Sequence, residues 1–289
     1  MRKRLLELLS KVLSPKEMSS VYGSFDIVGD IAIVRLTNVS KKKAKKIADA
    51  LMSVHGNVKT VLGQTNPVSG EFRIRRLIHV AGERRANTIH KESGCVFSVD
   101  LEKCYFSQRL SHERARIASL VKPDETVVNM FAGVGCFSIA IAKHVNSARV
   151  FSIDVNPMAV NLMQENIRLN RVFGQVIPLF GDAKTTVELH LQDKADRVLM
   201  PLPAKALEYL PAAVSALKPS GGWIHVHVFE HATKTENPVE KVKLKVAGAL
   251  ARLNLCVEVP LVRVVRKTGP NWFHLVADLH IRDSTTVRK

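Results

Sequence analysis

The stretch from Thr126 to Asp154, TVVNMFAGVGCFSIAIAKHVNSARVFSID, decides the fold class of this chain. It predicts an apolar strand over 126–130, a tight glycine turn and an amphipathic helix over 137–143. A second apolar strand over 148–153 then ends on the acid. This order of strand, glycine loop, helix, strand and acid is typical of the parallel crossover that binds nucleosides at the carboxyl ends of its strands.

The glycine turn indicates which nucleoside cofactor the crossover binds. Gly133 and Gly135 leave room for a ligand to approach the backbone, and Asp154 is placed to bind two ribose hydroxyls. Gly135 is followed by Cys136, Phe137 and Ser138, so the third glycine of the dinucleotide fingerprint is missing. S-Adenosylmethionine therefore fits the incomplete fingerprint better than NAD does. The alternative at this point is an ordinary α/β crossover without a ligand.

Length and composition describe a folded protein with room for one large and one small domain. The chain has 289 residues, of which 46% are hydrophobic and 24% charged. No apolar run reaches the roughly 18 residues of a membrane span, and residues 1–21 predict a basic helix rather than a signal peptide. The four scattered cysteines are expected to be reduced. We expect a cytoplasmic monomer that binds neither membrane nor metal.

The net charge of +17 favours a polyanionic partner. Residues 38–40 predict the cap of a helix that Gly56 closes. Five lysines between 41 and 46 and five arginines between 73 and 85 form two clusters in a predicted small α+β domain over residues 22–103. In the segment 72–75, apolar and basic residues alternate, which predicts a strand with one face in the core and one arginine face. RNA is favoured over DNA because the chain has no helix-turn-helix, zinc-finger or basic-zipper pattern.

Residues 104–289 include a helix that Ser111 is predicted to cap and that runs to about Val121, and they continue the alternation of strands and helices begun by the crossover. Asp182 follows a third strand over 176–180, where an acid commonly meets an adenine amino group; the alternative is an acid that caps a loop. Helices are predicted from Asn156-Pro157 to about Asn170 and over 204–217. Pro201 and Pro203 follow a fourth strand and form a rigid wall, and the order ends in an antiparallel hairpin. We expect an α/β fold of the class I S-adenosylmethionine-dependent methyltransferase type, Rossmann-like with a mostly parallel sheet. His225 and His227 share one strand face and are interpreted as structural.

Four motifs together resemble the archaeal–eukaryotic tRNA (guanine-37-N1)-methyltransferase family. They are Tyr-Phe-Ser-x-Arg-Leu-x-x-Glu-Arg at 105–114, Asn-Met-Phe-Ala-Gly-Val-Gly-x-Phe-Ser-Ile at 129–139, Asp-Val-Asn-Pro at 154–157 and Met-x-Leu-Pro at 200–203. The resemblance covers roughly residue 25 to the C-terminus. It implies a small tRNA-contacting domain before a methyltransferase domain, in a short form of the family without a further N-terminal domain.

The resemblance also implies roles for individual residues. Glu113 matches the general base that removes the proton from guanine N1, and Arg73, with Arg75 as second choice, matches the cation that stabilises charge on O6. Substrate contacts are implied for Arg75, Arg109 and Pro203. Cofactor contacts are implied for Arg114, Phe131, Gly133, Gly135, Asp154, Val155, Asp182, Ala183 and Pro201. A carboxylate base and a cation near O6 suit this chemistry, because guanine N1 is a poor nucleophile until its proton leaves.

Two departures from the family pattern keep other functions open. Asn129 stands where the family usually has an acid, and Pro201 stands where the fourth-strand motif has asparagine. The alternatives are a wybutosine-pathway 3-amino-3-carboxypropyl transferase and a methyltransferase of the tricyclic imidazo base, both acting at the same tRNA position. A non-catalytic RNA-binding protein that keeps the fold is a further alternative.

Overall fold

The structure is a computed structural model that describes residues 7, 9, 10, 14, 25–36, 39–66, 70, 72–253 and 257–282. Most of the predicted N-terminal helix over 1–21 lies outside these residues. Contacts divide the chain into a first unit, Met1–Gln108, and a second unit, Arg109–Lys289. Among the described residues, no helix is both long and apolar enough to span a membrane.

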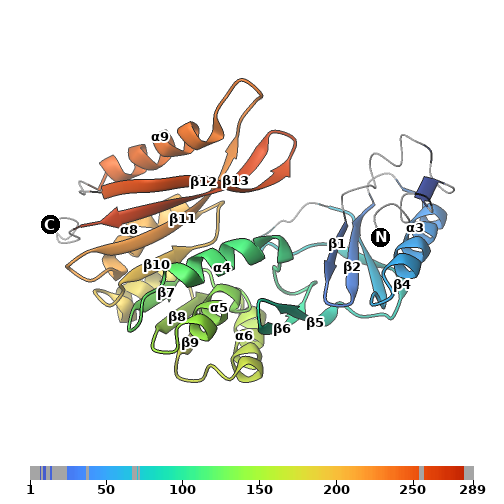
Figure 1. The fold of residues 1–289 in the computed structure, drawn as a ribbon, viewed down its shortest axis with the longest axis horizontal. Helices are drawn as coiled ribbons and strands as arrows, with labels where there is room; N and C mark the ends of the chain where they lie inside the picture. Colours follow the sequence, from blue (N-terminus) through green and yellow to red (C-terminus); the bar gives the residue numbers. More distant parts are fainter. Residues whose placement is uncertain are drawn as a thin grey trace. The chain divides into compact units, whose positions relative to one another are not determined.

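The first unit contains a four-stranded sheet with a helix against it (Figure 1). The sheet has the order β1-β2-β3-β4, and a separate ribbon pairs β5 with β6. Strands β2 and β3 are parallel and α3 connects them, whereas the other pairs are antiparallel. The bounds are β1 Phe25–Val28, β2 Ile31–Arg35, α3 Lys41–Val54, β3 Thr60–Gln64, β4 Leu77–Gly82, β5 Asn87–Glu92 and β6 Cys95–Asp100.

Helix α3 forms where the sequence predicts it. Ser40 caps its N-terminus by accepting a hydrogen bond from the backbone N–H of Lys43 at 3.4 Å. The apolar residues at helical spacing are buried in the core of the unit, while four of the five clustered lysines are exposed. The helix therefore has one face in the core and one cationic face in solvent.

The second unit is built on a seven-stranded sheet of order β12-β13-β11-β10-β7-β8-β9. The five strands from β11 to β9 are parallel, and β13 pairs antiparallel with both β11 and β12. This confirms the Rossmann-like sheet with a C-terminal antiparallel hairpin. The bounds are α4 Ser111–Leu120, β7 Thr126–Asn129, α5 Cys136–His144, β8 Arg149–Asp154, α6 Pro157–Asn170, β9 Val176–Phe180, α7 Ala183–Thr186, β10 Arg197–Met200, α8 Leu210–Ala216, β11 Gly222–His231, α9 Pro238–Ala251, β12 Val257–Gly269 and β13 Trp272–Ile281.

The two faces of this sheet differ in chemistry. Alternate residues of β11 and β13, such as Val226 and Ala277, join a large apolar core that includes residues of α8 and α9. The residues between them point to the opposite face, and four of these are polar although they are buried: His225, His227, His274 and Asp278. A polar buried face is stable only where its groups are hydrogen-bonded.

Three predicted elements differ from the structure. The strand predicted from 72 begins only at Leu77, because Arg73 has a left-handed backbone with φ of 52°. The helix predicted over 204–217 divides into a 3₁₀ turn, Ala206–Tyr209, and α8, since Pro211 cannot donate the backbone bond that would continue one helix. Ser111 is the first residue of α4, and no side chain caps that helix.

Gly135 precedes α5 in a left-handed conformation, with φ of 89°. A Cβ atom there would lie 2.9 Å from Cγ of Met163 and 3.3 Å from Cδ1 of Ile139. Backbone conformation and packing therefore account for this glycine, whereas the sequence suggests the approach of a ligand.

We expect Gly135→Ala to lower the free energy of unfolding by about 1–2 kcal/mol, the cost of a left-handed conformation for a residue with a Cβ. Gly248→Ala is the matched control, because Gly248 lies in α9 and a Cβ there would have no neighbour within 4 Å. Alanine at that position should raise stability by roughly 0.5–1 kcal/mol. Denaturant titration of both variants measures the difference; equal effects would contradict the conformational role of Gly135.

Candidate active site

The glycine loop and Asp154 meet at the carboxyl ends of β7 and β8. Oδ2 of Asp154 accepts the backbone N–H of Gly133 at 2.6 Å, and Oδ1 accepts that of Asn156 at 2.9 Å. Burial raises the pKa of Asp154, and these two donors oppose the rise. Each oxygen keeps lone-pair capacity for a further donor, so the carboxylate suits the ribose hydroxyls of an adenosyl cofactor. Val155 follows, partly buried.

Asp182 lies at the end of the next strand, β9, and caps α7. Its Oδ1 accepts the backbone N–H groups of Lys184 and Thr185, and its Oδ2 accepts the hydroxyl of Tyr209 at 2.7 Å. Tyr209 also packs edge-on against Phe131, with ring centroids 5.2 Å apart. The capping interaction given as the alternative is thus present, and a contact between Asp182 and adenine stays a prediction. Ala183 is the buried first residue of α7.

The remaining positions of the loop region lie on neighbouring strands. Asn129 is fully buried and donates to Oγ of Ser138 at 3.1 Å, while Ser152 donates to the same oxygen at 2.7 Å. Ser138 of α5 therefore joins Asn129 of β7 to Ser152 of β8. Pro201 and Pro203 follow β10 and are partly exposed. Because β10, β7, β8 and β9 are adjacent, the predicted cofactor residues of these strands share one edge of the sheet.

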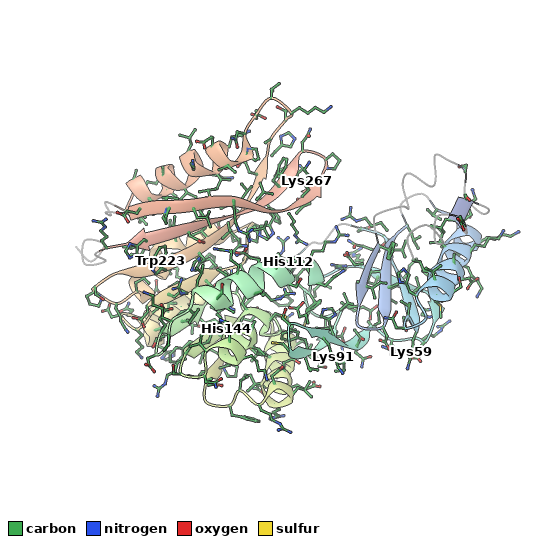
Figure 2. All side chains as sticks on the ribbon, viewed as in Figure 1. Lys59, Lys91, His112, His144, Trp223 and Lys267 are labelled. Carbon is green, nitrogen blue, oxygen red and sulfur yellow. The ribbon has the colours of Figure 1, made fainter. Side chains whose placement is uncertain are left out.

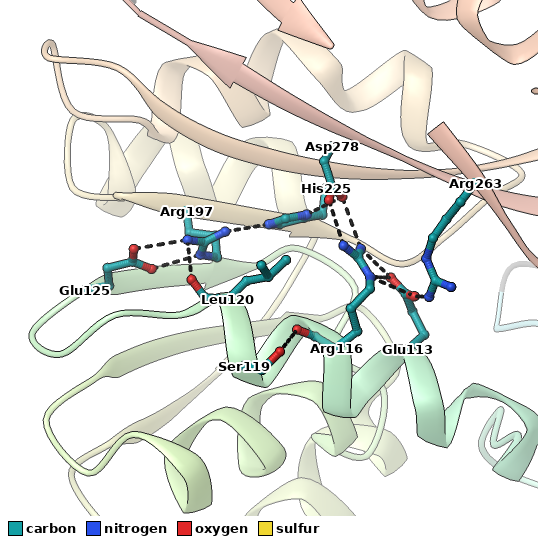
Figure 3. A network of polar contacts seen from close by, with 9 residues as sticks. All are labelled: Glu113, Arg116, Ser119, Leu120, Glu125, Arg197, His225, Arg263 and Asp278. Carbon is teal, nitrogen blue, oxygen red and sulfur yellow. Dashed lines mark hydrogen bonds and ion pairs between the residues drawn. The ribbon is translucent and has the colours of Figure 1, made fainter. Parts of the chain in front are cut away.

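Glu113 is completely buried in the first turn of α4, and two arginines bind its carboxylate (Figure 3). Arg116, one turn further along the helix, donates from Nη2 to Oε1 at 2.7 Å and from Nε to Oε2 at 3.1 Å. Arg263 of β12 donates from Nη2 to Oε2. Both oxygens of the predicted base are therefore occupied. Arg114, beside it in sequence, is buried as well.

The ion pair continues from Arg116 into the polar face of the sheet (Figure 3). Asp278 of β13 accepts two hydrogen bonds from Arg116, at 2.7 and 3.1 Å, and lies 2.6 Å from Nδ1 of His225. Nε2 of His225 is 2.7 Å from Arg197, which pairs with Glu125 at 2.8 Å. Asp278 and His225 are cross-strand partners, so the sheet register itself sets their contact.

The charges of this network determine how strongly Glu113 holds a proton. Burial raises the pKa of Glu113, but the hydrogen bonds of Arg116 and the charges of His227, Arg116 and Arg263 outweigh it, so the pKa lies below its usual value. Burial lowers the pKa of His227 to about 4. His227 is therefore neutral near pH 7, and the cations beside Glu113 at that pH are the two arginines. Asp278 has a strongly lowered pKa for the same reason: its partners His225 and Arg116 outweigh its burial.

The predicted arginines of the first unit are placed differently from the prediction. The guanidinium of Arg73 lies over the ring of Tyr105, 5.7 Å from its centroid. Arg75 does not present its guanidinium to solvent: its side chain is 9% exposed, lies 3.7 Å from Asp26 and donates to the carbonyl of Phe106 at 3.3 Å. The prediction of an arginine face over 72–75 is therefore wrong.

Exposed cations of this unit include Lys59 and Lys91 (Figure 2). Arg109, the first residue of the second unit, is exposed.

Sequence reasoning misses three members of the Glu113 network: Arg116, Arg263 and Asp278. Arg116 lies three residues after Glu113, a spacing that pairs side chains on a helix, but it can equally be interpreted as solvated surface. Arg263 and Asp278 are 150 and 162 residues away from their partners on α4, and no local pattern marks them. The polar alternation in β11 is the one available signal.

Comparison with known proteins gives the family. Residues 88–252 match the model of the TRM5/TYW2 methyltransferase domain, and residues 5–85 match the TYW2 N-terminal domain. The chain is similar to tRNA (guanine(37)-N(1))-methyltransferase Trm5b of Pyrococcus abyssi, with 38% identity over 89% of this chain and 74% of that protein. It is also similar to tRNA 4-demethylwyosine(37)-methyltransferase Taw21 of Saccharolobus solfataricus, with 35% identity over 91% of this chain and 96% of that protein.

A solved structure agrees with these sequence matches. The crystal structure of Pyrococcus horikoshii TYW2 in complex with MeSAdo has a TM-score of 0.75 and 29% identity, and the match covers 98% of this chain and 99% of that one. The matched domain spans more than half of the chain and includes the glycine loop, Asp154, Asp182 and Glu113. The protein therefore belongs to the TRM5/TYW2 methyltransferase family.

Proposed function

We propose that the protein transfers the methyl group of S-adenosylmethionine to N1 of guanine 37 in tRNA, with Glu113 as the general base. The family acts on position 37 of tRNA with this cofactor, and its members differ in the group transferred and in the acceptor base. The observation that carries our choice is Glu113, a buried carboxylate on the helix that leads into the cofactor domain. Methylation of a protonated ring nitrogen needs such a base.

The residues at the carboxyl ends of the strands suit the cofactor. Asp154 has lone pairs free for ribose hydroxyls, and Gly133, which donates its backbone N–H to Asp154, and Gly135 both have a positive φ in the loop beside it. When bound, S-adenosylmethionine supplies an activated methyl on a sulfonium, so the chain mainly aligns the acceptor and removes its proton. All the cofactor assignments stay predictions: Arg114, Phe131, Gly133, Gly135, Asp154, Val155, Asp182, Ala183 and Pro201.

Glu113 would take the N1 proton as the new bond from N1 to the methyl carbon forms and the bond to sulfur breaks. The proton ends on a carboxylate oxygen, and the electron pair of the broken bond stays on sulfur. Arg116 keeps the carboxylate oriented, because its other side is fixed by Asp278. We assign Arg73 to the charge on O6, and Arg75, Arg109 and Pro203 to binding of the substrate.

A second candidate function is methyl transfer to the tricyclic imidazo base of an already modified tRNA. It is favoured by the match to Taw21, which extends over 96% of that protein compared with 74% of Trm5b. The 3-amino-3-carboxypropyl transfer of the wybutosine pathway is favoured by the TYW2-type N-terminal domain. Pro201, in place of the usual asparagine, is the position where these acceptors would be distinguished.

The acceptor and the transferred group can be identified in one assay. We expect N1-methylguanosine in nuclease digests of unmodified tRNA carrying guanine 37 after incubation with the cofactor, measured by mass spectrometry. A parallel tRNA that carries the imidazo base should stay unchanged. A methyl on the imidazo base, or the mass of a carboxypropyl group, would assign the protein to the corresponding alternative.

We expect Glu113→Gln to lower single-turnover methyl transfer by about 10²- to 10⁴-fold, the usual contribution of a general base. Binding of cofactor and tRNA, measured by calorimetry, should persist because glutamine keeps the shape of the side chain. Glu240→Gln is the control, since Glu240 lies exposed on α9 and pairs with Lys243. Turnover by Glu113→Gln equal to that of the control would remove Glu113 from the base role.

Affinity for tRNA should fall steeply with salt, because each phosphate that the protein neutralises releases counterions. Lys42 and Lys46 are exposed on α3, one turn apart. Replacing both by alanine should lower the salt slope by about one for each phosphate that is no longer neutralised. Lys243→Ala on α9 is the matched exposed control. A slope unaltered in the double variant would exclude α3 from the tRNA-binding surface.

A further inference from the structure

The two arginines on Glu113 are held in different ways. Arg116 binds two carboxylates at once, Glu113 and Asp278, and its side chain is 19% exposed. Arg263 has one ion-pair partner among the described residues, Glu113, and its side chain is 36% exposed. Its Nε, although buried, has no hydrogen-bond partner in the described part of the chain. The guanidinium of Arg116 is therefore held by two carboxylates, whereas among the described residues that of Arg263 is held by the carboxylate of Glu113 alone.

In this arrangement each oxygen of the Glu113 carboxylate accepts two hydrogen bonds, since Arg116 donates to Oε1 from both Nη2 and Nε. Its side chain is 0% exposed, Oε1 accepts from Arg116, and Oε2 accepts from both arginines. Withdrawal of Arg116 would leave Asp278 and Glu113 buried without their common cation, which is costly. Withdrawal of Arg263 leaves the Arg116–Asp278 pair intact and removes one of the two donors to Oε2, which keeps its bond from Nε of Arg116. Of the two arginines, Arg263 is therefore the one whose release breaks fewer ion pairs.

Electrostatics also favours the release of one arginine. The groups facing Glu113 are Arg116 on α4, Arg263 on β12, His227 on β11 and, through Arg116, Asp278 on β13. With His227 neutral, the carboxylate is surrounded by two positive charges that make it a weak proton acceptor. Withdrawal of one of them makes Glu113 more basic at the moment when a proton must be accepted.

We propose that Arg263 is a positioning residue that holds Glu113 in the free enzyme and leaves its carboxylate when tRNA binds, so that Oε2 becomes the proton acceptor. The inference rests on the proposed role of Glu113 as base. It assigns to β12 a residue whose release couples binding of the tRNA to activation of that base.

The proposal is tested by a double-mutant cycle on tRNA binding, with Glu113→Gln, Arg263→Gln and the double variant in the presence of S-adenosylmethionine. If the pair breaks on binding, tRNA binding includes the cost of breaking it only when both charged residues are present. The effect of Glu113→Gln on Kd should then differ by about tenfold between the Arg263 and Arg263→Gln backgrounds, in the direction of tighter binding where Arg263 is present.

Two further variants keep the result interpretable. Arg263→Lys retains the charge and should restore part of the coupling, and the exposed pair Glu240–Lys243 on α9 should give no coupling in the same cycle. Thermal unfolding of each variant shows that it is folded. Equal effects of Glu113→Gln in both backgrounds would mean that the pair survives binding and would overturn the proposal.

The cycle measures binding and needs no turnover. An absence of coupling in the cycle would therefore contradict only the role of Arg263. The proposed function would be contradicted by a different result, namely that Glu113→Gln retains its activity. Coupling together with an active Glu113→Gln variant would leave Arg263 as a tRNA-linked contact of a residue that is not the base, and would overturn the assignment of Oε2 as proton acceptor.

Discussion

The second unit depends on the ion pair that Arg116 makes with two carboxylates at once. Glu113 and Asp278 are both buried, and each would be unstable there as an isolated charge. One guanidinium between them, with five donors in a fixed plane, satisfies both and sets their orientation. The helix that carries Glu113 is thereby tied to the strand that carries Asp278. Removing a single partner of such a pair typically costs about 3–5 kcal/mol.

The need to bind Arg116 explains why the two faces of the sheet differ: one packs in the apolar core and the other carries polar groups. Its apolar face packs against α8 and α9 and supplies burial, which is the main stabilising contribution. Its other face carries His225, Asp278 and His227 in positions set by strand register. A purely apolar second face would pack as well, but it would leave nothing to bind Arg116. The same buried polar groups thus bind Arg116 and, through it, orient the carboxylate of Glu113, the candidate base.

The cofactor residues follow a different rule. Asp154 and Asp182 lie at the ends of adjacent strands, and each accepts backbone N–H groups that shape its own loop. Their local and predicted ligand-binding roles are compatible, since a carboxylate has more acceptor positions than these bonds use. Asn129 likewise serves its own surroundings, because its neutral amide donates to Ser138 of α5 and accepts the backbone N–H of Phe131 without adding a charge there.

The sequence alone determined the Rossmann-like order, the glycine loop, the acids at the strand ends and the family motif around Glu113, because each depends on residues close together in the chain. The helices α3 and α6 were also predictable, since cap and apolar spacing agree in both. Only the tertiary structure decided that Arg75 points inward and that Arg73 interrupts a strand. It also decided that Arg263 and Asp278 reach α4 from the C-terminal hairpin. Those contacts are set by sheet register and helix packing across more than a hundred residues, and no local spacing records them.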